Sequence, residues 1–112
     1  MKSVVIIINQ APYGDERAYN ALRYANALLA AAVQVKVYLL ADAVACAKRG
    51  QILPKGYYNV ENIITGITHR GATVPCAEAR GLRAEELIEG TAFGRMDELA
   101  QWTAESEGVA VF

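Results

Sequence analysis

The chain has 112 residues and a mass of 12.1 kDa, the size of one domain, because a division into two would leave each core too small to be stable. Hydrophobic residues make up 54% of the chain and charged residues 21%, which excludes a disordered protein. The formal net charge of −1 argues against binding to nucleic acid or to an anionic membrane surface. We therefore predict one compact domain over residues 1–112, with no nucleic acid and no membrane among its partners.

Neither a membrane span nor a secretion signal is expected. The longest run of branched apolar residues covers residues 4–8 and stops at Asn9, whereas a spanning helix needs about 20 apolar residues. Residues 10–13 then have the composition of a turn rather than of a cleavage site.

The cysteines indicate a reducing compartment. Cys46 and Cys76 are the only two, and a chain that can bury its own core does not need a disulfide. We therefore predict free thiols and a cytoplasmic location. With no CxxC pair and with His69 as the only histidine, the chain lacks the ligands for a zinc site, and we expect no metal or organic cofactor.

The first half of the chain alternates strand and helix. Residues 2–8 form a short, continuous, β-branched run, typical of a strand buried on both faces. Asp15 is predicted to cap a following helix, which has an alanine-rich apolar stripe and ends near Ala32. Residues 34–40 alternate as a second strand, and residues 43–48 follow as a short helix.

The second half continues this alternation. Asn59 is predicted to cap a helix over residues 60–70, which Gly71 ends. The remaining predicted elements are a strand at 72–75, a helical turn at 84–87, a strand at 88–93, a helix at 95–106 with Met96, Leu99, Ala100 and Trp102 as core candidates, and a last strand at 109–112. Such alternation predicts an α/β sandwich, with a mostly parallel sheet covered by helices on both faces.

Polar and reactive side chains gather in three loops that follow predicted strands. These loops are residues 9–15, 41–42 and 76–81. Ligands of an open parallel sheet bind beyond the carboxyl ends of its strands, where these three loops emerge. That edge is therefore the predicted site.

Cys76 is the most informative residue of that edge. A thiol placed between a strand and a helical turn faces backbone N–H groups, which stabilise a thiolate and lower the pKa, and Arg80 would add positive charge. The competing interpretation is a buried, inert cysteine, and the two are about equally supported. Cys46 lies in an alanine-rich helix and fits the structural interpretation better.

Several more specific enzyme classes fail on spacing. A phosphate-binding cysteine loop needs an arginine six positions after the cysteine, where this chain has Leu82. Neither GxGxxG nor GxxxxGK[ST] is present, and the predicted helix places His69 at the opposite edge from Cys76. For Asp42 the sequence favours a helix cap over a site residue, and for Tyr57 and Tyr58 it favours packing over the lining of a ligand site.

Taken in order, the motifs resemble the YchN-like branch of the DsrE/DsrF-like family over nearly the whole chain. The matching segments are VIIINQAPYG at 5–14, LLADAV at 39–44, RGQ at 49–51, GYYNV at 56–60, CAEARGL at 76–82, LIEG at 87–90 and ELAQWT at 98–103. The resemblance implies a three-layer α/β/α sandwich with a five-stranded, mostly parallel sheet. It also implies a homotrimer or homohexamer in the cytoplasm.

The resemblance further implies a sulfur carrier. Sulfur-relay members of the family hold a persulfide on the cysteine matched here by Cys76, receive the sulfur from a donor protein and pass it to an acceptor thiol. We therefore expect Cys76 as the catalytic residue. The expected substrate-binding residues are Asn9, Tyr13, Asp42, Arg80 and Gly81.

One departure from the branch affects how sulfur would leave. YchN-like relatives have a second cysteine three residues before the matched position, whereas this chain has residues 73–75, Thr-Val-Pro. Release through an internal disulfide with that partner is therefore not expected, and the acceptor is another thiol. The alternative function is a homo-oligomeric protein that binds a small ligand, or has a structural or regulatory role, without catalysis.

Overall fold

The computed structural model describes residues 2–77 and 80–112 and contains one five-stranded sheet. The strand order is β4-β3-β2-β1-β5, and each neighbouring pair is parallel. The strands are β1 (Ser3–Ile8), β2 (Gln34–Leu39), β3 (Val74–Cys76), β4 (Thr91–Phe93) and β5 (Gly108–Val111). The mostly parallel α/β sheet is thus confirmed.

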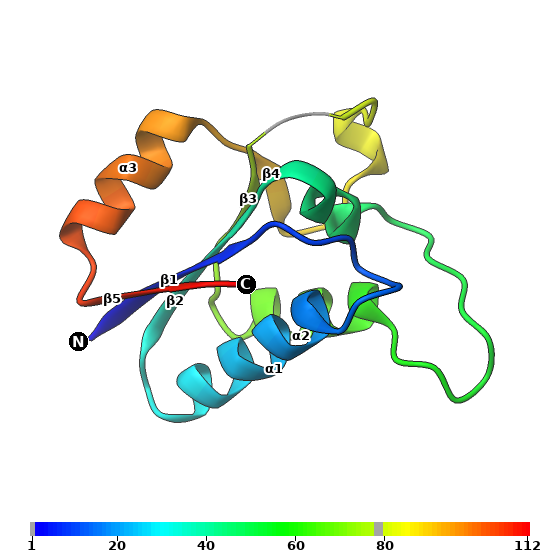
Figure 1. Cartoon of the computed structure of the whole chain (residues 1–112), viewed down its shortest axis with the longest axis horizontal. Helices are drawn as coiled ribbons and strands as arrows, with labels where there is room; N and C mark the ends of the chain where they lie inside the picture. Colours follow the sequence, from blue (N-terminus) through cyan, green and yellow to red (C-terminus); the bar gives the residue numbers. More distant parts are fainter. Residues whose placement is uncertain (1, 78–79) are drawn as a thin grey trace.

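Helices cover both faces of this sheet. The helices α1 (Arg17–Ala30) and α2 (Val60–His69) lie on one face, and α3 (Met96–Glu105) lies on the other (Figure 1). Two 3-10 helices complete the chain, η1 (Ala41–Ala47) after β2 and η2 (Ala84–Glu86) between β3 and β4. The three-layer α/β/α arrangement is confirmed as well.

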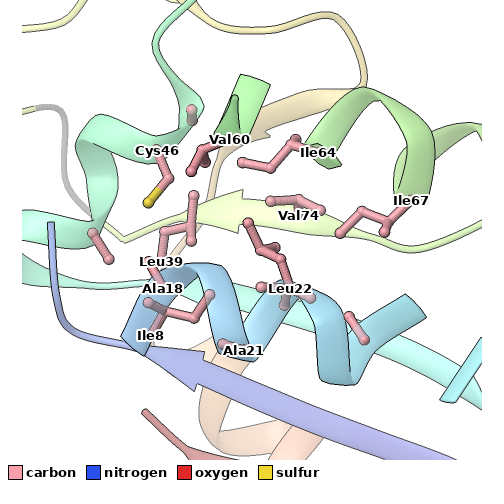
Figure 2. Close-up of a cluster of buried hydrophobic side chains, with 14 of the residues drawn as sticks. Ile8, Ala18, Ala21, Leu22, Leu39, Cys46, Val60, Ile64, Ile67 and Val74 are labelled. Atoms are coloured by element: carbon pink, nitrogen blue, oxygen red, sulfur yellow. The ribbon is translucent and has the colours of Figure 1, made fainter. Parts of the chain in front are cut away.

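The larger core lies between the sheet and the α1, α2 and η1 side. Leu22 of α1, Ile64 of α2 and Leu39 of β2 are all fully buried there (Figure 2). Alanines at 18, 21 and 25 let α1 approach the sheet closely, which explains the alanine-rich stripe in the sequence. Cys46 of η1 belongs to this same core (Figure 2).

A smaller core lies under α3. Val5, Tyr38 and Leu99 form it, and Trp102 packs against it with its ring nearly perpendicular to that of Tyr38. The Tyr38 hydroxyl donates a hydrogen bond to the Arg95 carbonyl, which satisfies the polar end of a fully buried ring.

Helix ends show how well local signals predicted structure. The Asn59 side chain accepts a hydrogen bond from the Asn62 N–H at 3.0 Å, as predicted for a cap. Asp15 similarly accepts from the Arg17 N–H at 2.8 Å, although Glu16 occupies the cap position.

Two core candidates in α3 were wrong, because Met96 is 59% exposed and Ala100 is also exposed. Only the side of α3 that carries Leu99 and Trp102 faces the sheet.

Strands β3 and β4 depart most from their predicted boundaries, and the ends of the other strands differ by one residue at most. Residues 88–90 form a turn rather than strand, since the Thr91 N–H donates to the Ile88 carbonyl and Gly90 has a φ of +95°. Strand β3 begins at Val74 and reaches Cys76, one residue further than predicted.

In the part of the chain that the structure describes, no helix is long and apolar enough to cross a membrane.

Candidate functional site

The three loops predicted to form the site meet at one cavity. It has a volume of about 320 Å³ and lies beyond the carboxyl ends of the strands. Ala11 comes from the loop after β1, Arg80 comes from the segment after β3, and η1 contributes Ala41, Asp42 and Ala45. The described lining is therefore three alanines with one carboxylate and one guanidinium.

The two charged residues of the described lining form an ion pair. The Arg80 Nη2 atom lies 2.6 Å from Asp42 Oδ1, although the residues are 38 positions apart in the chain. Both side chains reach solvent, with 44% of Arg80 and 68% of Asp42 exposed. The helix-cap interpretation of Asp42 was wrong, since η1 begins after Leu40 with no side-chain cap and the Asp42 carboxylate is used by Arg80.

Backbone strain is concentrated at this cavity. Among the described residues, three that are not glycine have a positive φ. Ala32, at 62°, ends α1, which is a common place for that conformation, but Ala41 at 50° and Arg80 at 46° both line the cavity. Gly81 continues the turn at +83°, a conformation that glycine adopts without a steric penalty.

Cys76 lies next to the cavity but is not in its described lining. It is the last residue of β3, pairs in register with Leu39, and is fully buried on the α1 and α2 side of the sheet. The next N–H along the chain, that of Ala77, donates to the Leu39 carbonyl at 3.0 Å. That N–H extends the sheet and is not free to stabilise a Cys76 thiolate.

The pKa values of both thiols are raised, whereas the sequence predicted a lowered pKa for Cys76. Burial raises the pKa of Cys76 from 9.0 to about 11, so the thiol is neutral at pH 7. Burial, with a smaller contribution from the charge of Cys76, raises the pKa of Cys46 to about 12. The lowered pKa expected from backbone N–H groups and Arg80 was therefore wrong, because desolvation dominates.

Tyr13 and Asn9 have structural partners away from the cavity lining. The Tyr13 hydroxyl donates to the Gln51 side chain and accepts from the Val60 N–H at 3.1 Å, so it joins the loop after β1 to the start of α2. Burial raises the pKa of this hydroxyl, which keeps it protonated. The Asn9 N–H donates to the Phe112 carbonyl at 2.9 Å, which fixes the loop to the C-terminal segment.

A cluster of tyrosines lies beside this network. The rings of Tyr19 and Tyr58 stack with centroids 4.2 Å apart, and Tyr57 and Tyr13 contact Tyr58 at 5.0 and 5.7 Å. The packing interpretation of the Tyr57–Tyr58 pair is thus the one the geometry supports. Tyr19 was missed, because a half-buried tyrosine in a helix gives no sequence signal of a partner 39 residues away.

No metal site is seen among residues 2–77 and 80–112, where no three His, Cys, Asp or Glu side chains gather. His69 is exposed in the last turn of α2, which leads to the start of β3, so it lies away from the carboxyl ends of the strands, as predicted.

The chain is thus a three-layer α/β/α protein with a parallel sheet. Its candidate site is a cysteine at the carboxyl end of an inner strand, beside a small cavity. The chain belongs to the DsrE/DsrF-like family, whose model matches residues 2–112. It is 39% identical to an uncharacterized protein of Methanopyrus kandleri, covering 97% of this chain and 93% of the relative. It is 36% identical to protein YchN of Escherichia coli K12, covering all of both chains.

Solved structures agree with this family. The crystal structure of E. coli YchN superimposes with a TM-score of 0.93 over all of both chains, at 35% identity. A conserved protein of unknown function from Bacteroides thetaiotaomicron gives a TM-score of 0.70 at 12% identity, over 99% of this chain and 95% of that one, and supports the fold alone. Family membership suggests a sulfur-relay role, and none of these relatives' names states an activity.

Proposed function

We propose that this protein is a sulfur carrier that accepts sulfane sulfur on Cys76 as a persulfide. The observation that carries the proposal is the position of Cys76 at the carboxyl end of β3, beside a cavity built from all three predicted loops, in a chain of the DsrE/DsrF-like family. A cysteine is sufficient for this chemistry, because sulfur itself is the group that moves.

The transfer consists of two exchange steps. In the first, the Cys76 thiolate attacks the outer sulfur of a donor persulfide, the donor's S–S bond breaks, and the donor leaves as a thiolate. In the second, an acceptor thiolate attacks the outer sulfur of the Cys76 persulfide and releases the Cys76 thiolate. Each step forms one sulfur–sulfur bond and breaks another, so no external oxidant or reductant is consumed.

Burial of Cys76 affects how fast this carrier would take up and release sulfur. A neutral thiol with no exposed surface loads slowly unless the end of β3, where Cys76 pairs with Leu39 of β2, opens locally. The same burial slows the transfer of a bound persulfide to small thiols in solution. We therefore propose a protein that retains sulfur until a donor or acceptor protein engages the cavity edge, in the reducing cytoplasm that free thiols require.

The test is intact-mass spectrometry of the reduced protein after incubation with a persulfide donor. Wild type and Cys46→Ala should each gain the mass of one sulfur atom, and Cys76→Ala should gain none. Cys46→Ala is the matched control, since it removes the other buried thiol of the same core. If Cys76→Ala still gains sulfur, or if wild type gains none even at a pH near 11, where about half of Cys76 is thiolate, the proposal fails.

A second candidate function is binding of a small ligand without group transfer. The observation that favours it is the cavity itself, whose charged pair is exposed while the thiol is fully buried. In that case ligand binding would persist in Cys76→Ala, and persulfide would not form in wild type.

A further inference from the structure

The two strands that flank Cys76 are held in the fold to different degrees. On one side, β2 has four buried residues, among them Leu39, the register partner of Cys76. On the other side, β4 is the last strand of the sheet, and none of its three residues is buried. Segments with few buried apolar contacts open at the lowest free-energy cost in a folded protein. Of these two strands, β4 is therefore the one that moves away from Cys76 more readily.

Phe93 lies at the carboxyl end of β4, directly beside Cys76. The two residues are in register on neighbouring parallel strands, so their side chains point to the same face of the sheet. Phe93 is 40% exposed, whereas Cys76 is fully buried. The Phe93 side chain therefore lies between the strand that carries the thiol and the edge of the sheet, where it covers the thiol from that side.

The turn that follows Phe93 is bonded to the two strands beyond β4. The Gly94 N–H donates a hydrogen bond to the Cys76 carbonyl at 2.6 Å. The Tyr38 hydroxyl, which comes from β2, donates a hydrogen bond to the Arg95 carbonyl. A Cβ atom added at Gly94 would lie 2.9 Å from the Tyr38 hydroxyl oxygen, so a glycine at this position allows the close approach. Displacement of the turn would break both bonds and free the end of β3.

From these contacts we propose that the end of β4 and the turn after it, residues 93–95, form a gate through which Cys76 becomes reactive. In this gate the Phe93 ring covers the thiol and the Tyr38 hydroxyl holds the turn closed. The inference rests on the proposed function, in which a donor or acceptor protein must reach a buried thiol. Phe93 and Tyr38 act through Cys76, which makes them positioning residues. The gate lies at the same carboxyl edge of the sheet as the cavity, so a protein bound there meets both.

The test compares the two buried cysteines of one core. Modification of Cys76 by iodoacetamide is followed by mass spectrometry in Cys46→Ala protein, and modification of Cys46 is followed in Cys76→Ala protein, both at a pH of about 8. Opening of the gate exposes Cys76 alone, whereas global unfolding exposes both cysteines. The ratio of the two rates therefore distinguishes the gate from a general loss of stability.

Two variants open the gate in different ways. Tyr38→Phe removes the hydroxyl but keeps the ring, and Phe93→Ala removes the cover. Each should raise the Cys76 rate relative to the Cys46 rate by about three- to tenfold, the factor expected for the loss of one hydrogen bond or of a partly buried ring. Tyr13→Phe is the matched control, because it removes a hydroxyl that joins the loop after β1 to the start of α2. It should not raise the Cys76 rate selectively.

Two outcomes overturn the inference. One is a Cys76 rate that neither Tyr38→Phe nor Phe93→Ala changes, and the other is a rise that Cys46 shares in full. Neither outcome bears on whether Cys76 of wild type gains sulfur, which the mass measurement tests separately. Conversely, a selective rise in both variants with no persulfide on wild type would retain the gate and reject the sulfur-carrier proposal.

Discussion

Cys76 and Cys46 belong to the same core and have similar surroundings, yet their positions in the fold differ. Cys46 lies inside η1 and faces the large core, whereas Cys76 ends a strand at the edge where the cavity forms. The chain sequence placed Cys76 at that edge, but it did not reveal how completely η1 and the sheet exclude water from the thiol. Desolvation depends on residues brought together from distant segments, which no local pattern records.

The raised pKa predicts slow, pH-dependent alkylation of Cys76. A shift from 9.0 to about 11 lowers the thiolate fraction at pH 8 about a hundredfold relative to an ordinary thiol, and burial slows the reaction further. The rate at which iodoacetamide modifies Cys76, measured in Cys46→Ala by mass spectrometry, should still be rising at pH 10. In guanidinium, where the protein is unfolded, Cys76 should react at the rate of an ordinary thiol. A rate that levels off below pH 8 would mean a stabilised thiolate instead.

The same shift fixes the sign of a stability effect. The folded-state pKa lies above the unfolded one, so the contribution of Cys76 to the free energy of unfolding is fully present below pH 9 and is lost as the pH rises through 11. Wild type should therefore lose more stability over this pH interval than Cys76→Ala does.

At the scale of elements, features that depend on one segment of the sequence were predicted well, whereas contacts between distant segments were not predicted. The β-branched run of β1 and the Asn59 cap of α2 depend on adjacent residues, and both are as predicted. The Asp42–Arg80 pair joins residues 38 positions apart, so the sequence supplied the residues of the cavity but not their pairing. Met96 was placed in the core because helical spacing does not say which side of α3 meets the sheet.

Gly94 marks a close approach between elements that predicts a stability effect. A Cβ atom there would lie 2.9 Å from Pro75 Cβ and 2.9 Å from the Tyr38 hydroxyl oxygen, so β3, β4 and the start of α3 would have to separate. Gly94→Ala should lower the free energy of unfolding by about 1–3 kcal/mol, measured by urea denaturation.

Gly66 supplies the control for that substitution. It lies within α2 and has no positive φ, and a Cβ atom added there would have no neighbour within 4 Å outside its own helix backbone. Gly66→Ala should raise the free energy of unfolding by roughly 0.5–1 kcal/mol, because alanine is the better helix former. Equal effects of the two substitutions would contradict the close packing at Gly94.

For the whole molecule, apolar surface beside α3 supports self-association. Val109 and Val111 pair in register with Val5 and Ile7, so they share the sheet face that α3 covers only in part. They are 44% and 65% exposed. Two exposed valines on the same face of an edge strand are typical of an interface, and we propose that a second copy of the chain covers them.

Light scattering coupled to gel filtration tests this assembly. Wild type should elute as an oligomer, and Val111→Lys should shift it toward the monomer. Ile52→Lys should not, although Ile52 is 94% exposed, because it belongs to the connection between η1 and α2, a segment that runs away from β5 (Figure 1). A monomeric wild type, or dissociation by Ile52→Lys alone, would reject this surface.

The central claim, that Cys76 both takes up and gives up sulfur, is tested most directly by a pulse and chase. Cys46→Ala protein is loaded from a persulfide donor, freed of the donor by gel filtration, and mixed with an excess of an acceptor thiol at a pH near 10, and the masses of both are followed. We expect the protein to gain one sulfur and then to return to its unmodified mass as the acceptor gains the same amount. A protein that never loads, or sulfur that stays bound or remains after Cys76→Ala substitution, would contradict this claim.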